Sequence, residues 1–175
     1  MKTNKYLLDQ IKHLEGRILT IDVEDYILTA IDKNDAIKDC IELDSITKEN
    51  SGHYSLFSKK LSSKKMKKKF KKKRIDTIIV NNISLKPMIN TFVRDSVYIA
   101  KTNVYIYGSE KESPSNILIK RYKRYNTKIE KITENGYILK IDTTNAKNNW
   151  FKDLGYTILD NWQEFIDMLA SYLTN

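Results

Sequence analysis

The sequence is poor in the residues that form covalent and metal cross-links. Its 175 residues include one cysteine, Cys40, and two histidines, His13 and His53. A single cysteine excludes an intramolecular disulfide, and three such ligands scattered along the chain do not supply a Cys/His zinc site. We therefore expect no metal site and interpret Cys40, which lies in an apolar stretch, as a buried structural thiol. This cysteine usage favours a reducing compartment, the cytoplasm.

Glycine is also scarce, with five in the chain, and no apolar run is long. The sequence has no Gly-x-x-x-x-Gly-Lys-Ser/Thr loop for a nucleoside triphosphate and no Gly-x-Ser-x-Gly nucleophile turn. Asp9, Lys12 and His13 interrupt the apolar residues near the N-terminus, where a signal peptide needs about 7–15 of them in succession. No window approaches the ~20 apolar residues of a transmembrane segment. We therefore expect a soluble intracellular protein with no transmembrane segment.

Positive charge is concentrated in one segment. The formal net charge of +9 comes from 31 lysines and arginines and 22 acids. The sequence KKLSSKKMKKKFKKKR at residues 59–74, here called the lysine run, holds 11 of these cations and no acid, which leaves 20 cations against 22 acids elsewhere. Such a local excess predicts a basic patch rather than a globally cationic surface.

Apolar periodicity predicts alternating helices and strands in a single domain over residues 1–175. Gly16 stands where a helix C-cap is expected. The expected helices cover residues 4–15, 24–34, 86–100, 113–126 and 162–173, and the expected strands cover residues 17–22, 36–45, 75–82, 103–108, 128–132 and 137–142.

This order predicts an α/β fold with a doubly wound, mostly parallel Rossmann-like sheet flanked by helices. The last two strands are separated by the turn TENG and predict an antiparallel C-terminal hairpin. The strand IDTIIVNN at 75–82 is almost continuously apolar, so we expect it to be central and covered on both faces. Residues 46–58 are polar and predict a loop. This loop and the lysine run occupy residues 46–74, where a doubly wound sheet would have a third strand and its helix, so the sheet could be one strand short there.

The layout resembles the class I S-adenosylmethionine-dependent methyltransferase fold, a doubly wound sheet that ends in an antiparallel hairpin. The resemblance extends over about residues 4–142. The segments that carry it are RILTIDVEDYILTAID as first strand and helix, CIELDS as second strand, IDTIIVNN as the fourth-strand block, FVRDSVYIAKTNVYIYG as the following helix and strand, and GYILKID near the end.

The resemblance implies an S-adenosylmethionine site with a marked departure in its first loop. In the family this loop is rich in glycine, which lets the backbone approach the cofactor. Here it reads Asp22-Val23-Glu24-Asp25, so a β-branched side chain and three acids replace glycine. The implied cofactor is therefore S-adenosylmethionine in a degenerate or altered site, or none.

The resemblance also assigns roles to the polar residues that end the predicted strands. Asp22 and Glu24 would line the methionine part of the cofactor. Glu42 or Asp44 would accept hydrogen bonds from the ribose hydroxyls. The alternative for Glu42 and Asp44 is that they cap a strand end or a following helix.

Asn81 and Asn82 are the candidate catalytic residues. They stand at the carboxyl end of the fourth-strand block, which in the family lies beside the transferred methyl group. Ile83-Ser84-Leu85 follows them, in place of the Pro-Pro-aromatic sequence of methyltransferases that modify amino groups of nucleic acids. The alternative is a polar turn that caps the next helix.

The lysine run supports a hypothesis of a different class, a non-enzymatic module that binds the backbone of RNA or DNA. Clustered cations bind phosphates by releasing counterions. Met66 and Phe70 are four residues apart, which predicts a short helix with both facing the core. A second basic cluster, KRYKRYN at 120–126, would extend the surface. The alternatives are a solvated segment without a partner and attachment to an anionic membrane.

The candidate nucleic-acid-binding residues are Lys64, Lys65, Lys67, Lys68, Lys69, Lys71, Lys72, Lys73 and Arg74.

Overall fold

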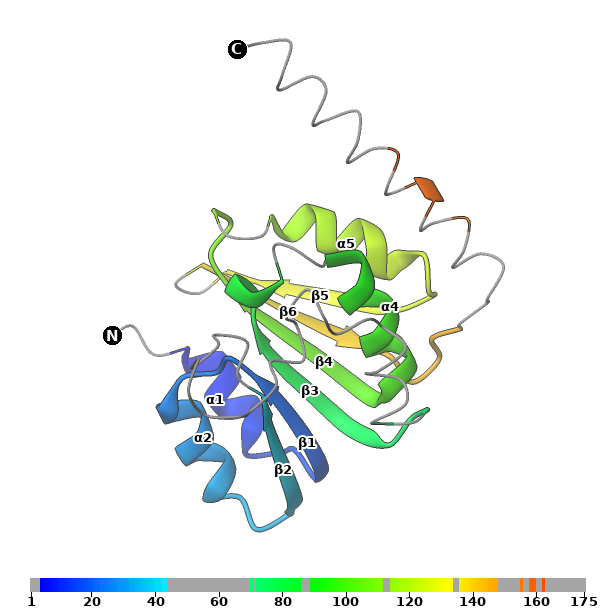
Figure 1. The fold of residues 1–175 in the computed structure, drawn as a ribbon. Helices are drawn as coiled ribbons and strands as arrows, with labels where there is room; N and C mark the ends of the chain where they lie inside the picture. Colours follow the sequence, from blue (N-terminus) through cyan, green and yellow to red (C-terminus); the bar gives the residue numbers. More distant parts are fainter. Residues whose placement is uncertain are drawn as a thin grey trace, which may run out of the picture.

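The computed structural model describes residues 4–43, 70, 72–85, 89–111, 114–133, 136–147, 155, 158, 159 and 162. These residues form one six-stranded sheet with helices on both faces (Figure 1). The predicted mostly parallel, Rossmann-like α/β fold is confirmed. The loop expected at 46–58, most of the lysine run, Pro87 and almost all of the helix expected at 162–173 lie outside the described residues.

The observed elements follow the predicted order. The helices are α1 (Lys5–Ile11), α2 (Asp25–Asp32), α4 (Ile89–Ile99) and α5 (Ser115–Lys123), with a short 3-10 helix η1 (Asn82–Ser84) after the third strand. The strands are β1 (Gly16–Ile21), β2 (Ile37–Leu43), β3 (Ile75–Asn81), β4 (Ala100–Gly108), β5 (Lys128–Ile132) and β6 (Tyr137–Asp142).

The sheet has the strand order β2-β1-β3-β4-β6-β5. Strands β2, β1, β3 and β4 are parallel, whereas β6 pairs antiparallel with both β4 and β5, as the predicted hairpin requires. The chain proceeds from β1 outward to β2 and then returns to β3 on the other side of β1. This reversal is the topological switch point of a doubly wound sheet. In Figure 1 the carboxyl ends of β3 and β4 lie to the left and their amino ends to the lower right.

Each face of the sheet carries its own apolar core. Helices α1 and α2 cover one face, and α4 and α5 cover the other (Figure 1). Strand β3 contributes side chains to both cores, so the prediction that residues 75–82 form a central strand is confirmed. The first core includes Leu7, Ile11, Ile27, Ile31, Ile79 and Tyr105; the second includes Phe92, Val97, Leu118, Ile78, Val80 and Val104.

The predicted end of the first helix is wrong. Helix α1 ends at Ile11, because the side-chain amide of Asn34 donates to the carbonyls of Ile11 and Leu14, at 2.7 and 2.9 Å. Gly16 instead opens β1 with a φ of 79°, and a Cβ there would lie 2.3 Å from the carboxylate of Asp76. That carboxylate accepts the backbone N–H of Arg17 at 2.8 Å. The glycine is therefore needed for the contact between β1 and β3, not as a helix cap.

The described end of the lysine run is fixed to the folded domain. Phe70 is buried in the core beneath α4, so the prediction that it faces the core is confirmed, while Met66 lies outside the described residues. Lys73 donates from its ammonium to the carbonyls of Ala100 and Thr143, at 2.7 and 2.9 Å. Burial, with a smaller effect from neighbouring Lys72, lowers the pKa of Lys73.

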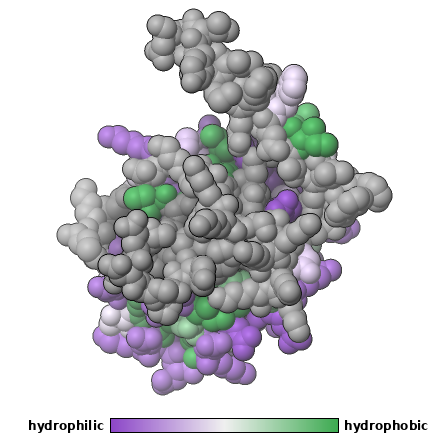
Figure 2. Space-filling model, in the orientation of Figure 1, coloured by the Kyte–Doolittle hydropathy of each residue, from purple (hydrophilic) through white to green (hydrophobic). Residues whose placement is uncertain are grey.

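Hydrophilic side chains gather along the lower margin of the face seen in Figure 2, over α2 and the connection from α2 to β2. Lys33, Asp35, Ala36 and Lys38 are exposed there. This margin is the solvent side of the two-stranded β1–β2 portion.

We expect Phe70→Ala to lower the free energy of unfolding by about 3 kcal/mol, because it removes a buried aromatic ring and leaves a cavity. Chemical denaturation measures the change. Lys72→Ala, two residues away at an exposed position, serves as the control and should change stability by less than about 0.5 kcal/mol. Equal effects of the two substitutions would show that Phe70 does not anchor the run.

Candidate functional site

The candidate site is the edge of the sheet at the carboxyl ends of β1 and β3, here called the switch-point edge. Open α/β sheets bind ligands outside the carboxyl ends of their strands at such a reversal. Asp22 follows β1, Glu24 precedes α2, and Asn81 ends β3. The structure therefore brings together three of the residues that the sequence proposed as a site.

The carboxylate of Glu24 is the centre of this edge. It accepts a short hydrogen bond from the hydroxyl of Tyr107 on β4 and a longer one, 3.4 Å, from the side-chain amide of Asn81. Burial, reinforced by the bond to Glu24, raises the pKa of Tyr107 far above its usual value, so the phenol remains a donor. Glu24 thus ties the start of α2 to the ends of β3 and β4.

The turn between β1 and α2 has a glycine-type backbone without a glycine. Asp22 adopts a φ of 50°, in the left-handed region that glycine enters at no steric cost. Aspartate tolerates this region better than most residues. Val23, the next residue, packs against the core of α1 and α2. The turn therefore contains a left-handed residue that is not glycine, and side chains line it.

The two asparagines have different environments. Asn81 is half-buried, and its side-chain oxygen accepts the N–H of Ile83 at 3.2 Å, so it caps η1 as well as contacting Glu24. This is the turn-capping role that the sequence left as an alternative.

Asn82 is a buried bridge between three strands. It donates to the carbonyl of Ser109 at 2.6 Å and to the hydroxyl of Tyr137 at 3.1 Å. A Cβ at Gly108, whose φ is 147°, would lie 1.9 Å from its side-chain oxygen. A catalytic role for Asn82 stays a prediction, and it would require these bonds to open.

The described contacts of Glu24 and Asn81 do not include the predicted ribose-binding residue Glu42. Glu42 is exposed on the edge strand β2, opposite Thr20 in the strand register. Asp44 lies outside the described residues. Their role in binding ribose stays a prediction. Within the described ranges, no three His, Cys, Asp or Glu side chains gather closely enough to hold a metal ion.

The end of the lysine run lies at the opposite end of β3. Lys72 and Arg74 are exposed just before β3 begins at Ile75, whereas Asn81 ends the strand. At about 3.3 Å per residue, the two ends are on the order of 20 Å apart. The candidate residues Lys64, Lys65, Lys67, Lys68, Lys69 and Lys71 lie outside the described residues.

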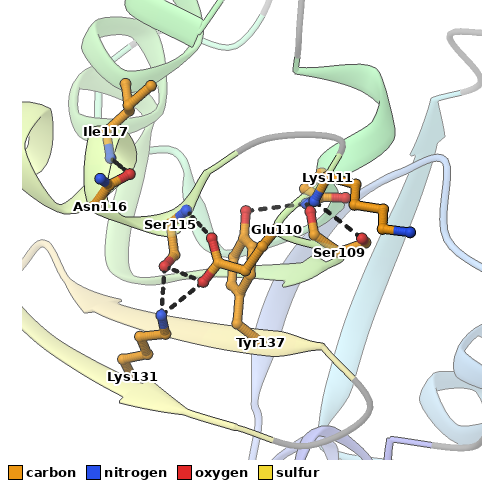
Figure 3. Close-up of polar contacts among 9 residues, drawn as sticks. Ser109, Glu110, Lys111, Ser115, Asn116, Ile117, Lys131 and Tyr137 are labelled. Atoms are coloured by element: carbon orange, nitrogen blue, oxygen red, sulfur yellow. Dashed lines mark hydrogen bonds and ion pairs between the residues drawn. The ribbon is translucent and has the colours of Figure 1, made fainter.

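Sequence reasoning missed a polar cluster beside the switch-point edge (Figure 3). The Glu110 carboxylate accepts the backbone N–H of Ser115 at 2.7 Å and its hydroxyl at 2.5 Å. Lys131 on β5 donates to Glu110 at 2.7 Å and to the Ser115 hydroxyl at 2.6 Å. Because Glu110 and Lys131 both bond Ser115, this cluster fastens the start of α5 to β5. No short motif joins these residues, since β5 supplies the lysine.

Tyr107, Gly108 and Tyr137 were predicted only as strand residues, yet they shape the site. Tyr107 bonds Glu24, and Tyr137 bonds Asn82. Burial raises the pKa of Tyr137 to about 12, although the bond from Asn82 opposes this effect. In the sequence, the pair Tyr107-Gly108 marks the end of an apolar strand. It does not reveal whether the tyrosine lies only in the core or also contacts the switch-point edge.

No protein-family model matches the chain, and no curated protein matches it. Three residues define the switch-point edge: Asp22, Glu24 and Asn81.

Glu110 should make stability depend on pH in the acid range. Burial raises its pKa, but the hydrogen bonds from Lys131 and Ser115 together outweigh burial and lower the pKa to about 2, from 4.5. A carboxyl group whose pKa is lower in the folded than in the unfolded state stabilises the fold above pH 4.5. This contribution is lost as the pH falls toward 2. We expect Glu110→Gln to be less stable than the native chain at neutral pH, with the difference shrinking between pH 4.5 and 2.

Denaturant unfolding across this pH range measures the effect. Glu15→Gln changes charge equally at an exposed position and serves as the control. A stability difference for Glu110→Gln that stays constant down to pH 2 would contradict the assignment.

Proposed function

We propose that this chain is a methyltransferase-like protein in which the use of S-adenosylmethionine is altered or lost. Three features support the relationship to methyltransferases. The sheet reverses its order between β1 and β3, it ends in an antiparallel hairpin, and Asp22 keeps a glycine-type turn after β1. A cytoplasmic location accompanies this proposal as a prediction.

The proposal that S-adenosylmethionine use is altered rests on the Glu24 carboxylate, which accepts hydrogen bonds from Tyr107 and Asn81. S-adenosylmethionine carries an ammonium group that an acid tolerates, but also a carboxylate that Glu24 and its acidic neighbours repel. Val23 adds bulk where the family has glycine. The residues present do not fit the usual mode of binding this cofactor, so we derive no methyl-transfer step.

Calorimetry with S-adenosylmethionine and S-adenosylhomocysteine tests the proposal. For the native chain we expect no saturable heat below about 1 mM ligand, which is a binding free energy weaker than about 4 kcal/mol. Val23→Gly/Glu24→Gly should bind at least about ten-fold more tightly, because it removes both the bulk and the carboxylate. Glu24→Gln separates charge from bulk and should give a smaller gain.

Thermal unfolding must first show that each variant folds, since Tyr107 loses its acceptor when Glu24 is replaced by glycine. Micromolar binding by the native chain would contradict altered cofactor use. Absence of binding by the native chain and by every folded variant would contradict the methyltransferase-like proposal itself.

A second candidate function is binding of nucleic acid through the lysine run. It is favoured by Lys72 and Arg74, which are exposed where the run enters the sheet, while Lys73 is fixed by two carbonyls. The described end of the run is therefore fixed to the edge of the sheet, with Lys72 and Arg74 exposed to solvent. No helix within the described part of the chain is both long and apolar enough to cross a membrane.

Replacing Lys67, Lys68, Lys69, Lys71 and Lys72 with glutamine should weaken binding to RNA and reduce its salt dependence. Each lost phosphate contact lowers the slope of log affinity against log salt by about 0.7–0.9. Lys73 is retained because its side chain supports the fold. Fluorescence anisotropy at several salt concentrations measures both quantities. The control replaces five exposed lysines elsewhere: Lys5, Lys12, Lys33, Lys38 and Lys111. An affinity for RNA that ignores salt, or equal losses in both variants, would count against this function.

A further inference from the structure

Four segments meet at the amino-terminal edge of β3 and β4, opposite the switch-point edge. The N–H of Lys73 donates to the carbonyl of Tyr98 at 3.1 Å, and its ammonium bonds the carbonyls of Ala100 and Thr143. The N–H of Lys147 donates to the carbonyl of Tyr125 at 3.0 Å. These bonds fix the end of the lysine run, the α4–β4 junction, the α5–β5 turn and the residues after β6 relative to one another.

Cations predominate on these joined segments. Six exposed basic side chains, here called the amino-edge cations, come from all four of them: Lys72, Arg74, Lys101, Lys123, Lys128 and Lys147. Among the described residues, two carboxylates lie beside these cations, and both are partly buried and already bonded. Asp76 accepts the N–H of Arg17 and pairs with Lys101 at 3.4 Å, and Asp142 accepts the N–H of Thr144 at 2.8 Å.

The cationic surface stops at β1. Beyond it, Glu15, Asp35 and Asp39 are exposed at the same edge, and Arg17 is paired with Asp39 at 2.9 Å. The basic portion therefore covers the amino-terminal edge from β3 to β5. Neighbouring strands lie about 4.8 Å apart, so this portion spans on the order of 15 Å. A nucleic-acid duplex carries one negative charge per about 1.7 Å of its axis, so several phosphates fit along that length.

The side chains around this edge favour phosphate over other anionic surfaces. The large apolar residues that are exposed in the described part of the chain are Ile83, Ile117, Ile158, Leu159 and Trp162. None of them belongs to the described residues of the four segments, so this described part of the edge offers no apolar anchor of the kind that a membrane-surface site uses. Tyr122 and Tyr125 of the second basic cluster are buried and present no ring for stacking on bases.

We propose that the amino-edge cations, two of which belong to the described end of the lysine run, form one surface that binds the sugar–phosphate backbone of nucleic acid. The inference rests on the second candidate function and goes beyond it by adding cations from β4, α5, β5 and the segment after β6. Because phosphate contacts carry no base information, binding is independent of sequence. The surface lies away from Glu24 and Asn81, so it does not involve the switch-point edge.

The test leaves the lysine run unchanged. The full chain and the variant Lys101→Gln/Lys123→Gln/Lys128→Gln/Lys147→Gln are titrated into labelled duplex RNA, duplex DNA and anionic vesicles of phosphatidylserine and phosphatidylcholine. The matched control, Lys12→Gln/Lys33→Gln/Lys38→Gln/Lys111→Gln, removes the same charge from the C-caps of α1 and α2, from β2 and from the loop after β4. Thermal unfolding verifies that both variants fold.

We expect the amino-edge variant to bind duplex RNA or DNA at least about ten-fold more weakly at about 50 mM salt, with a slope of log affinity against log salt smaller by about three to four. The control should stay within about two-fold of the native chain. Equal losses in both variants would overturn the inference, because only net charge would then matter.

Two further outcomes separate this inference from the function on which it rests. If glutamines in the lysine run abolish binding but the amino-edge variant binds like the native chain, the inference fails and the second candidate function stands. If the native chain binds neither nucleic acid, both fail, and binding to vesicles alone would assign the surface to a membrane instead.

Discussion

The double-sided burial of β3 is the constraint on which the rest of the molecule depends. Ile78, Ile79 and Val80 are completely buried, and the strand pairs in parallel with β1 on one side and β4 on the other. The two ends of this strand lie at opposite edges of the sheet, which carry the candidate site and the basic surface. Asn81 lies at its carboxyl end, beside the switch point. Phe70 and Lys73 precede its amino end and contact the folded domain. Placement of the candidate ligand edge and of the basic edge therefore follows from one apolar segment.

Much of this fold could be predicted because local apolar patterns and the pairing of strands agree. The run at 75–82 is too uniformly apolar for an edge strand, and the hairpin is marked by its turn at 133–136. The predicted bounds of helices and strands were wrong where a residue distant in the sequence determines where the element begins or ends. Helix α1 ends early because Asn34 binds its carbonyls. Strand β4 begins at Ala100, before the predicted residue 103, because its first residues pair with β3 and bond Lys73.

The candidate site was predictable only in part, for a similar reason. Glu24 and Asn81 were both expected at the carboxyl ends of strands, so the parallel topology alone predicts that they lie close together. Tyr107 and Tyr137 could not be singled out, because in the sequence they are apolar strand residues with no sign of a polar partner. Their hydroxyls reach Glu24 and Asn82 only when β4 and β6 take their places beside β3. The contacts between neighbouring strands are thus the part of the site that could not be predicted from local sequence patterns.

The two edges carry charge of opposite sign, and this has a consequence for any combined function. Asp22, Glu24 and Asp25 surround the switch point, whereas Arg74 and Lys101 belong to the basic edge. With the ends of β3 on the order of 20 Å apart, the separation exceeds the Debye length of about 8 Å at physiological salt. A nucleic acid held at the basic edge is therefore neither repelled by Glu24 nor brought to it. The proposed relationship to methyltransferases and the proposed binding of a polyanion are therefore separable, because the residues on which each proposal depends lie at opposite ends of β3.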